Sequence, residues 1–101
     1  MSRIFEGATS FNQDIGSWDT SNVTDMSWMF NYADSFDVDI GGWDTSNVTY
    51  MSSMFNNASS FNQDLSGWCV SQFSSEPTHF DTYATAWTLP RPIWGTCTSL
   101  F

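Results

Sequence analysis

Aspartates recur at a spacing that would suit a divalent cation. Asp14, Asp39 and Asp64 stand 25 residues apart along the chain. If segments of that length stack, the carboxylates form a row, and Ca²⁺, which takes roughly six to eight oxygen ligands, would relieve their repulsion. The chain has no Asp-x-Asp-x-Asp-Gly loop, and aspartate at a turn also accepts backbone N–H bonds without metal. Asp14, Asp39 and Asp64 are therefore candidate calcium ligands, with a structural role as the alternative.

Three asparagines lie in the Asn-x-Ser/Thr pattern that accepts N-linked glycans. They are Asn22, Asn47 and Asn57. Asn22 and Asn47 occupy the same place in two repeats, so glycans on them would decorate one edge of a stack. The alternative is a ladder of hydrogen-bonded asparagine side chains that braces the turn between repeats.

The two cysteines, Cys69 and Cys97, form an even count that fits one disulfide in a secreted chain. In the chain-entropy account such a bridge stabilises by about 3–4 kcal/mol, and it would tie the C-terminal segment to the last repeat. The alternative is a pair of free, buried thiols.

The sequence offers little for catalysis. His79 is the single histidine. The chain has no Gly-x-Ser-x-Gly elbow, phosphate-binding glycine loop, Cys-x-x-Cys pair or His-Glu-x-x-His helix. We therefore expect a protein that is not an enzyme and that carries no cofactor.

An internal repeat organises most of the chain. Residues 1–25 and 26–50 are identical at 16 of 25 aligned positions, including the block WDTSNVT. Residues 51–68 continue the same register until Cys69 interrupts it. One such unit is too small to bury its own apolar side chains, so the copies are expected to stack. This divides the chain into repeats over 1–68 and a C-terminal cap over 69–101.

Each repeat contains two apolar patterns. Met26, Met29, Phe30 and Ala33 follow the spacing of one face of a short helix. The following segment, 36–43, predicts a short strand that ends at a glycine-containing corner. The sequence therefore predicts an LRR-like α/β solenoid of about three coils, each with a short strand and a helical turn. The side-chain rows expected in its core are Phe11–Phe36–Phe61, Trp18–Trp43–Trp68, Ile15–Ile40–Leu65 and Ala8–Ala33–Ala58.

The two ends of the stack are expected to differ. The segment 69–101 leaves the repeat but keeps many aromatic residues, and its three prolines favour an irregular lid over the third coil. The first coil has no such lid, so upstream repeats or another molecule would have to cover it. The residues expected to form an end-to-end interface are Met1, Ile4, Phe5, Leu100 and Phe101.

The charge balance excludes two classes of partner. Two basic residues stand against eleven acidic ones, for a formal net charge of −9. Such a chain has little to hold a nucleic acid backbone and is repelled by an anionic membrane. Its surface of Asp, Ser, Thr and Asn without lysine is typical of secreted proteins, and no apolar run has transmembrane length. We expect an extracellular or cell-surface location, no membrane insertion, and an N-terminus that has lost its signal peptide.

The repeat string MFxxAxSFxxDIxxWDTSNVTxM resembles the repeats of BspA-like leucine-rich-repeat surface proteins, and the resemblance covers residues 1–68. The ending, with Trp68-Cys69-Val70 and Trp94-Gly95-Thr96-Cys97, is similar to that family's terminal segment. The resemblance implies cell-surface display and adhesion or interaction without catalysis, with a protein or glycan surface as ligand. The alternative is a structural subunit whose copies stack end to end into an extracellular fibre.

Overall fold

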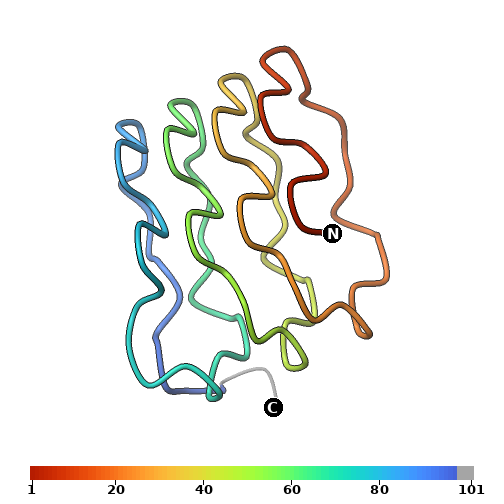
Figure 1. Ribbon diagram of the computed structural model, residues 1–101, viewed down its shortest axis with the longest axis vertical. Helices are drawn as coiled ribbons and strands as arrows, with labels where there is room; N and C mark the ends of the chain where they lie inside the picture. Colours follow the sequence, from red (N-terminus) through yellow and green to blue (C-terminus); the bar gives the residue numbers. More distant parts are fainter. Residues whose placement is uncertain (98–101) are drawn as a thin grey trace.

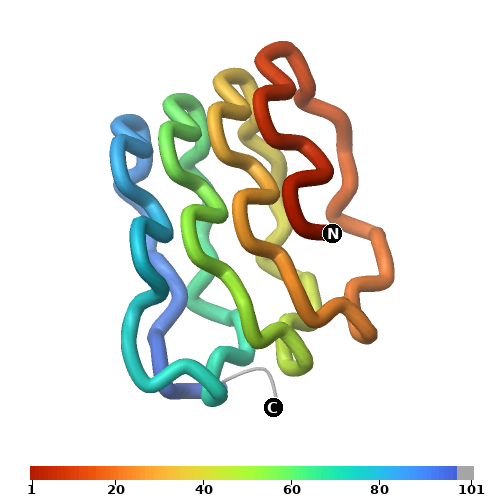
Figure 2. Tube along the Cα trace, viewed as in Figure 1, coloured from red at the N-terminus to blue at the C-terminus, as the bar shows by residue number. Residues whose placement is uncertain are grey.

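Four segments of the chain lie side by side in the order of the sequence, as the colour gradient shows in Figures 1 and 2. The structure, a computed structural model, describes residues 1–97. We call these segments the first coil (1–25), the second coil (26–50), the third coil (51–75) and the fourth coil (76–97). Leu100 and Phe101, two of the residues expected at an end-to-end interface, lie outside the described residues.

Backbone hydrogen bonds join each coil to the next, and most run from an N–H of the earlier coil to a carbonyl of the later one; Thr49 to Thr24 and Gly95 to Val70 run the other way. The N–H groups of Arg3, Phe5 and Gly7 donate to carbonyl oxygens of the second coil, at 3.1, 3.0 and 2.8 Å. The same three bonds recur at both later junctions. They run from Trp28, Phe30 and Tyr32 to Ser52, Met54 and Asn56, and from Ser53, Phe55 and Asn57 to Thr78, Phe80 and Thr82.

The predicted helical turns are absent. Between these rungs the intervening N–H groups close tight local turns, as when Met29 donates to Met26 and Ala33 donates to Phe30. Alternate N–H groups therefore point to the neighbouring coil and cannot enter an α-helical pattern. A succession of three-residue turns repeats its side chains at nearly the spacing of a helix, which explains why the apolar pattern was misleading.

The predicted strand over 36–43 is also absent. Within residues 1–97 the only bridge pairing is an isolated parallel one between Asp25 and Tyr50, and no helix or strand is present. The expectation of an α/β, leucine-rich-repeat-like solenoid is therefore wrong. Side chains partly replace a strand ladder here: Asn12 accepts from the N–H of Asp37, and Asp37 accepts from the N–H of Asn62, both at 2.9 Å.

The core consists of aromatic rows that run through the coils. Phe30 stacks on Phe36 within the second coil, with ring centroids 4.1 Å apart, and on Phe55 of the third coil at 5.4 Å. Phe36 stacks on Phe61 at 5.7 Å. Members of these rows in the second and third coils are fully buried, and each buried side chain contributes roughly 1.5–3 kcal/mol. Tryptophan indoles add buried hydrogen bonds between coils: the indole N–H of Trp68 donates to the carbonyl of Ile40 at 3.0 Å.

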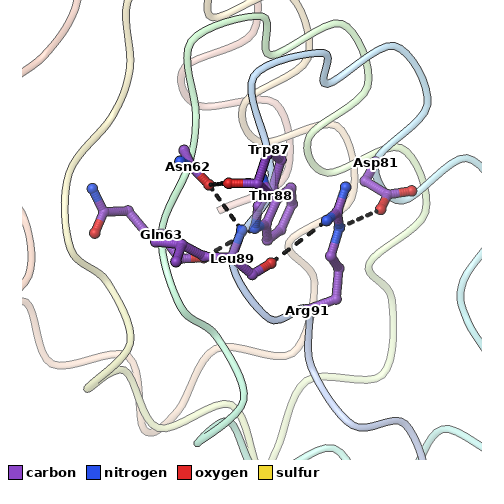
Figure 3. A network of polar contacts seen from close by, with 7 residues as sticks. All are labelled: Asn62, Gln63, Asp81, Trp87, Thr88, Leu89 and Arg91. Carbon is purple, nitrogen blue, oxygen red and sulfur yellow. Dashed lines mark hydrogen bonds and ion pairs between the residues drawn. The ribbon is translucent and has the colours of Figure 1, made fainter.

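The segment expected to be an irregular lid forms the fourth coil and continues the stack. Its local turns match those of the third coil, but at an offset of 26 residues instead of 25, so that Ala84 and Trp87 take the places of Ala58 and Phe61. Asn62 accepts from the N–H groups of Thr88 and Leu89, at 2.8 and 3.0 Å (Figure 3). The expectation of an irregular cap is therefore wrong.

The aromatic rings change orientation in the fourth coil. Trp87 meets Phe61 edge-on with an interplanar angle of 84°, whereas the rings of Phe36 and Phe61 are nearly parallel. Arg91 lies over the Trp87 ring at 4.7 Å and pairs with Asp81 at 3.0 Å (Figure 3). The outer end of the aromatic rows is thus closed by an ion pair.

Candidate functional site

Each aspartate proposed as a calcium ligand accepts hydrogen bonds within its own local turn. Asp14 accepts the N–H of Gly16 at 3.0 Å, Asp39 that of Gly41 at 2.9 Å, and Asp64 both the N–H and the hydroxyl of Ser66. In residues 1–97 no three acidic, histidine or cysteine side chains come together in a way that could hold a metal ion. The local bonds support the structural alternative for these aspartates.

Hydrogen bonds also set the acidity of several carboxyls. The Ser46 hydroxyl, and then its backbone N–H, lower the pKa of Asp44. Ser21 and Ser66 lower the pKa values of Asp19 and Asp64 in the same way, because bonds to the charged form favour it. These acids stay ionised at neutral pH and are engaged locally, so they are poor candidates for proton transfer.

The three sequon asparagines differ in their surroundings. The side-chain amide of Asn47 donates to the carbonyl of Ser21 at 2.6 Å and so braces the second coil on the first. Asn22 holds the corresponding place in the first coil and is exposed. Asn57 has a left-handed backbone, with φ of 60°, and its N–H donates to Thr82. The bracing alternative thus describes Asn47.

A disulfide joins Cys69 to Cys97, as the cysteine count predicted. It ties the end of the described chain to the third coil. Beside it lies a cavity of about 410 Å³, whose lining includes Trp43, Asp44 and both cysteines. The indole N–H of buried Trp43 is bonded to Ile15, and the Asp44 carboxylate accepts from the Ser46 hydroxyl, so these polar groups of the lining are already engaged.

His79 has no catalytic neighbourhood. It is exposed, and its Nδ1 lies 3.3 Å from the Thr82 hydroxyl. No carboxylate partner or nucleophile accompanies this ring in the contacts of the described chain.

The first coil leaves the core open on one side, where Met1, Ile4 and Phe5 were expected to form an interface. Met1 and Phe5 are half-buried and Ile4 is exposed. The clearest comparison is between tryptophans of one row: Trp18 is 41% exposed, whereas Trp43 is 3% exposed. The first coil therefore carries core residues that have no neighbour on their outer side among residues 1–97.

Two aromatic residues, half-buried Trp28 and exposed Tyr32, were missed by the sequence reasoning. Trp28 and Tyr32 have φ angles of 61° and 59°, in the left-handed region. Tyr32 is 53% exposed. The corresponding residue of the first coil is Gly7, with φ of 70°. The available signal was this alignment of an aromatic residue with glycine, because glycine at a repeated position marks a backbone that other residues adopt at a cost.

No helix in residues 1–97 is long and apolar enough to cross a membrane.

In comparisons with known proteins, the sequence model of a family described as "Mycoplasma protein of unknown function, DUF285" matches residues 1–88. The chain belongs to the DUF285 family. DUF285 is associated with BspA-like repeats, so the expected resemblance is confirmed at this coarser level. The DUF285 match extends through the third coil into the fourth. No curated protein and no solved structure matches the chain.

Proposed function

We propose that this protein is a non-catalytic interaction module of the BspA-like surface type, displayed outside the cell and binding a protein or glycan surface. The observation that carries the proposal is the pair Trp28 and Tyr32. A bulky side chain in the left-handed region costs about 1–2 kcal/mol, and exposed Tyr32 recovers little of that cost by packing. The left-handed backbone recurs at the equivalent positions of the other coils, such as Gly7 and Asn57, so the stack imposes it. What points to a function is the presence of an exposed aromatic side chain at a position that tolerates it only at a cost.

The chemistry of the pair suits recognition. Tyrosine and tryptophan supply large, rigid, amphipathic contact area at low entropic cost and are enriched in binding surfaces. The guanidinium of Arg3 lies over the Trp28 ring at 4.8 Å and holds it in place. Arg3 in turn pairs with Glu6 at 2.9 Å. An aromatic face flanked by a cation and a carboxylate fits a polar, hydroxyl-rich or peptide surface.

The rest of the repeat surface supports this assignment by elimination. Recurrent polar side chains such as Asp39, Thr45 and Asn47 are bonded within the stack. By contrast, the exposed Tyr32 side chain differs from Gly7 and Asn57 at the equivalent positions and has no hydrogen-bond partner within residues 1–97, so it can meet a partner.

The test uses binding of the purified chain to arrays of immobilised glycans and of glycoproteins before and after removal of their glycans. Tyr32→Gly restores the residue type found at Gly7, so we expect stability unchanged within about 1 kcal/mol but binding lost. Tyr50→Ser is the matched control, because Tyr50 is exposed without a left-handed backbone and Ser75 holds the aligned position. Equal binding by Tyr32→Gly and the unaltered chain would overturn the proposal.

A further inference from the structure

Every non-glycine residue with a left-handed backbone in residues 1–97 belongs to one of two rows that cross the coils. One row consists of Arg3, Trp28, Ser53 and His79, and the other of Tyr32, Asn57 and Tyr83, in line with Gly7. Backbone bonds between adjacent coils (Figure 2) keep the second row in register, since the N–H of Tyr32 donates to Asn56 at 3.0 Å and that of Asn57 to Thr82 at 2.8 Å.

Both rows carry rings in the second and fourth coils and a small side chain in the third. Tyr32 and Tyr83 are 53% and 71% exposed, and Asn57 between them is half-buried. In the other row, Ser53 is buried between the positions of two further rings. We call the rings of Trp28, Tyr32, His79 and Tyr83 the ring frame.

The spacing of the coils limits what fits inside the ring frame. Neighbouring hydrogen-bonded segments lie about 4.8 Å apart, so the second and fourth coils stand roughly 10 Å apart across the third. A flat ring that contacts Tyr32 on one face and Tyr83 on the other needs about 7–8 Å between the tyrosine rings. An α-helix of a partner, about 10–12 Å wide with its side chains, does not fit.

The third coil supplies uncharged polar groups between the tyrosines. The side-chain amide of Asn57 has no hydrogen-bond partner within residues 1–97 and offers both donors and an acceptor. Asn56 donates to Asn31 at 3.0 Å, but its own side-chain oxygen accepts nothing in the described chain. With a net charge of −9 on the chain, these groups suit a neutral ligand better than an anionic one.

We propose that a neutral glycan binds over the third coil, with one sugar ring between Tyr32 and Tyr83 and its hydroxyls on the amide of Asn57. The inference rests on the proposed function and narrows its ligand to glycans. The C–H groups on both faces of a sugar ring meet the electron-rich faces of the tyrosines, and its hydroxyls both donate and accept. An apolar side chain of a peptide in the same place would leave the Asn57 amide without a partner, at a cost.

Two variants test the second side of the frame and the space inside it. Tyr83→Asn gives the fourth coil the residue type of Asn57. Asn57→Tyr fills the space with a third ring, and the position accepts tyrosine because Tyr32 and Tyr83 have nearly the same φ, 59° and 60°. Near-ultraviolet circular dichroism checks the fold of each variant. Tyr50→Ser is the matched control, because Tyr50 is exposed but lies outside the ring frame.

Calorimetric titration with short neutral oligosaccharides of glucose, galactose, mannose or N-acetylglucosamine measures the outcome. We expect the unaltered chain and Tyr50→Ser to bind one of these sugars with equal affinity. Tyr83→Asn should bind it at least about tenfold more weakly, as expected on removal of a central aromatic contact. Asn57→Tyr should not bind, because the added ring occupies the place of the sugar.

The possible failures separate this inference from the proposed function. Unchanged affinity in Tyr83→Asn, or tighter binding by Asn57→Tyr, would overturn the inference, and loss of binding in Tyr32→Gly would still support the proposed function. Binding to proteins stripped of their glycans, with none to any oligosaccharide, would likewise overturn the inference alone, since the ligand is then a peptide. Undiminished binding by Tyr32→Gly would contradict the proposed function itself, and absence of binding to both kinds of probe would overturn both.

Discussion

The indole N–H of Trp43 donates to the carbonyl oxygen of Ile15, 3.0 Å away, and ties the second coil to the first. The Ile15 carbonyl also accepts the backbone N–H of Trp18. A single oxygen thus closes a turn in its own coil and anchors the next one. Trp68 repeats the arrangement on Ile40.

Replacing Trp43 with phenylalanine should therefore destabilise the protein. The change removes a buried hydrogen bond and leaves a small cavity, for a loss of roughly 1–3 kcal/mol in the free energy of unfolding. Urea denaturation followed by tyrosine and tryptophan fluorescence measures it. Trp18→Phe is the control, because the Trp18 indole is exposed and has no acceptor in the described chain; its effect should stay within about 0.5 kcal/mol. Equal losses in both variants would contradict the role given to the bond.

Glycine at position 16 is required by close approach of two coils. A Cβ atom there would lie 2.5 Å from the carbonyl oxygen of Asp39, which is backbone and cannot move aside. We expect Gly16→Ala to lower stability by about 1–3 kcal/mol. Gly67 has nothing within 4 Å of such an atom, so Gly67→Ala should be neutral or slightly stabilising. Thermal unfolding of the two variants measures the difference. A larger loss of stability in Gly67→Ala than in Gly16→Ala would contradict the packing argument.

Glu76 and Glu6 should respond to pH with opposite signs. Burial raises the pKa of Glu76, Asp81 raises it further by hydrogen bonding and by charge, and Arg91 opposes them. The folded state therefore favours protonated Glu76, and stability is lost as pH rises from the unfolded pKa through the folded one. Glu76→Gln should be more stable than the unaltered chain at pH 7, with the gain shrinking in acid.

For Glu6, hydrogen bonds from Asn31 and then from Arg3 lower the pKa. Its contribution is present above the unfolded pKa and is lost as pH falls through the folded value. Glu6→Gln should thus be less stable at pH 7 and equal to the unaltered chain in acid. Chemical denaturation at a series of pH values tests both residues, and a gain in stability for Glu6→Gln at neutral pH would count against the hydrogen-bond assignment.

The disulfide should protect the fourth coil in particular. Removing it with Cys69→Ser and Cys97→Ser, which span 28 residues, should lower the free energy of unfolding by about 3–4 kcal/mol. Hydrogen exchange should show lost protection first at Phe80 and Thr96, while Phe30 in the second coil keeps its protection until global unfolding. Uniform loss across all coils would show that the bridge stabilises the stack as one unit instead.

The repeat period predicted the core well but not the backbone that carries it. Phe36, Ile40, Trp43 and their equivalents in the third coil are buried as expected, whereas Trp18 of the first coil is 41% exposed. Helix and strand were wrong because spacing of apolar residues reports which side faces inward, and tight turns of three residues share that spacing with a helix. The left-handed backbone at Tyr32 was signalled only by its alignment with Gly7, and no glycine marks the row of Trp28.

The fourth coil was missed because one inserted residue breaks the period. Thr78, Ala84 and Trp87 lie 26 residues after Ser52, Ala58 and Phe61, and a search at the fixed 25-residue period passes over them. The dipeptide Tyr83-Ala84, followed three residues later by Trp87, matches Tyr32-Ala33 followed by Phe36 and was the available clue. The disulfide was predictable, since an even cysteine count left few alternatives.

The backbone rungs that share one direction give the molecule an electrical polarity. At each of its three junctions, three N–H groups point from the earlier coil to the later one. The peptide dipoles of these rungs are aligned, which places partial positive charge at the fourth coil and partial negative charge at the first. The net charge of −9 is thus superimposed on a dipole along the stacking direction. Above a charged surface, the chain would settle with one preferred end down.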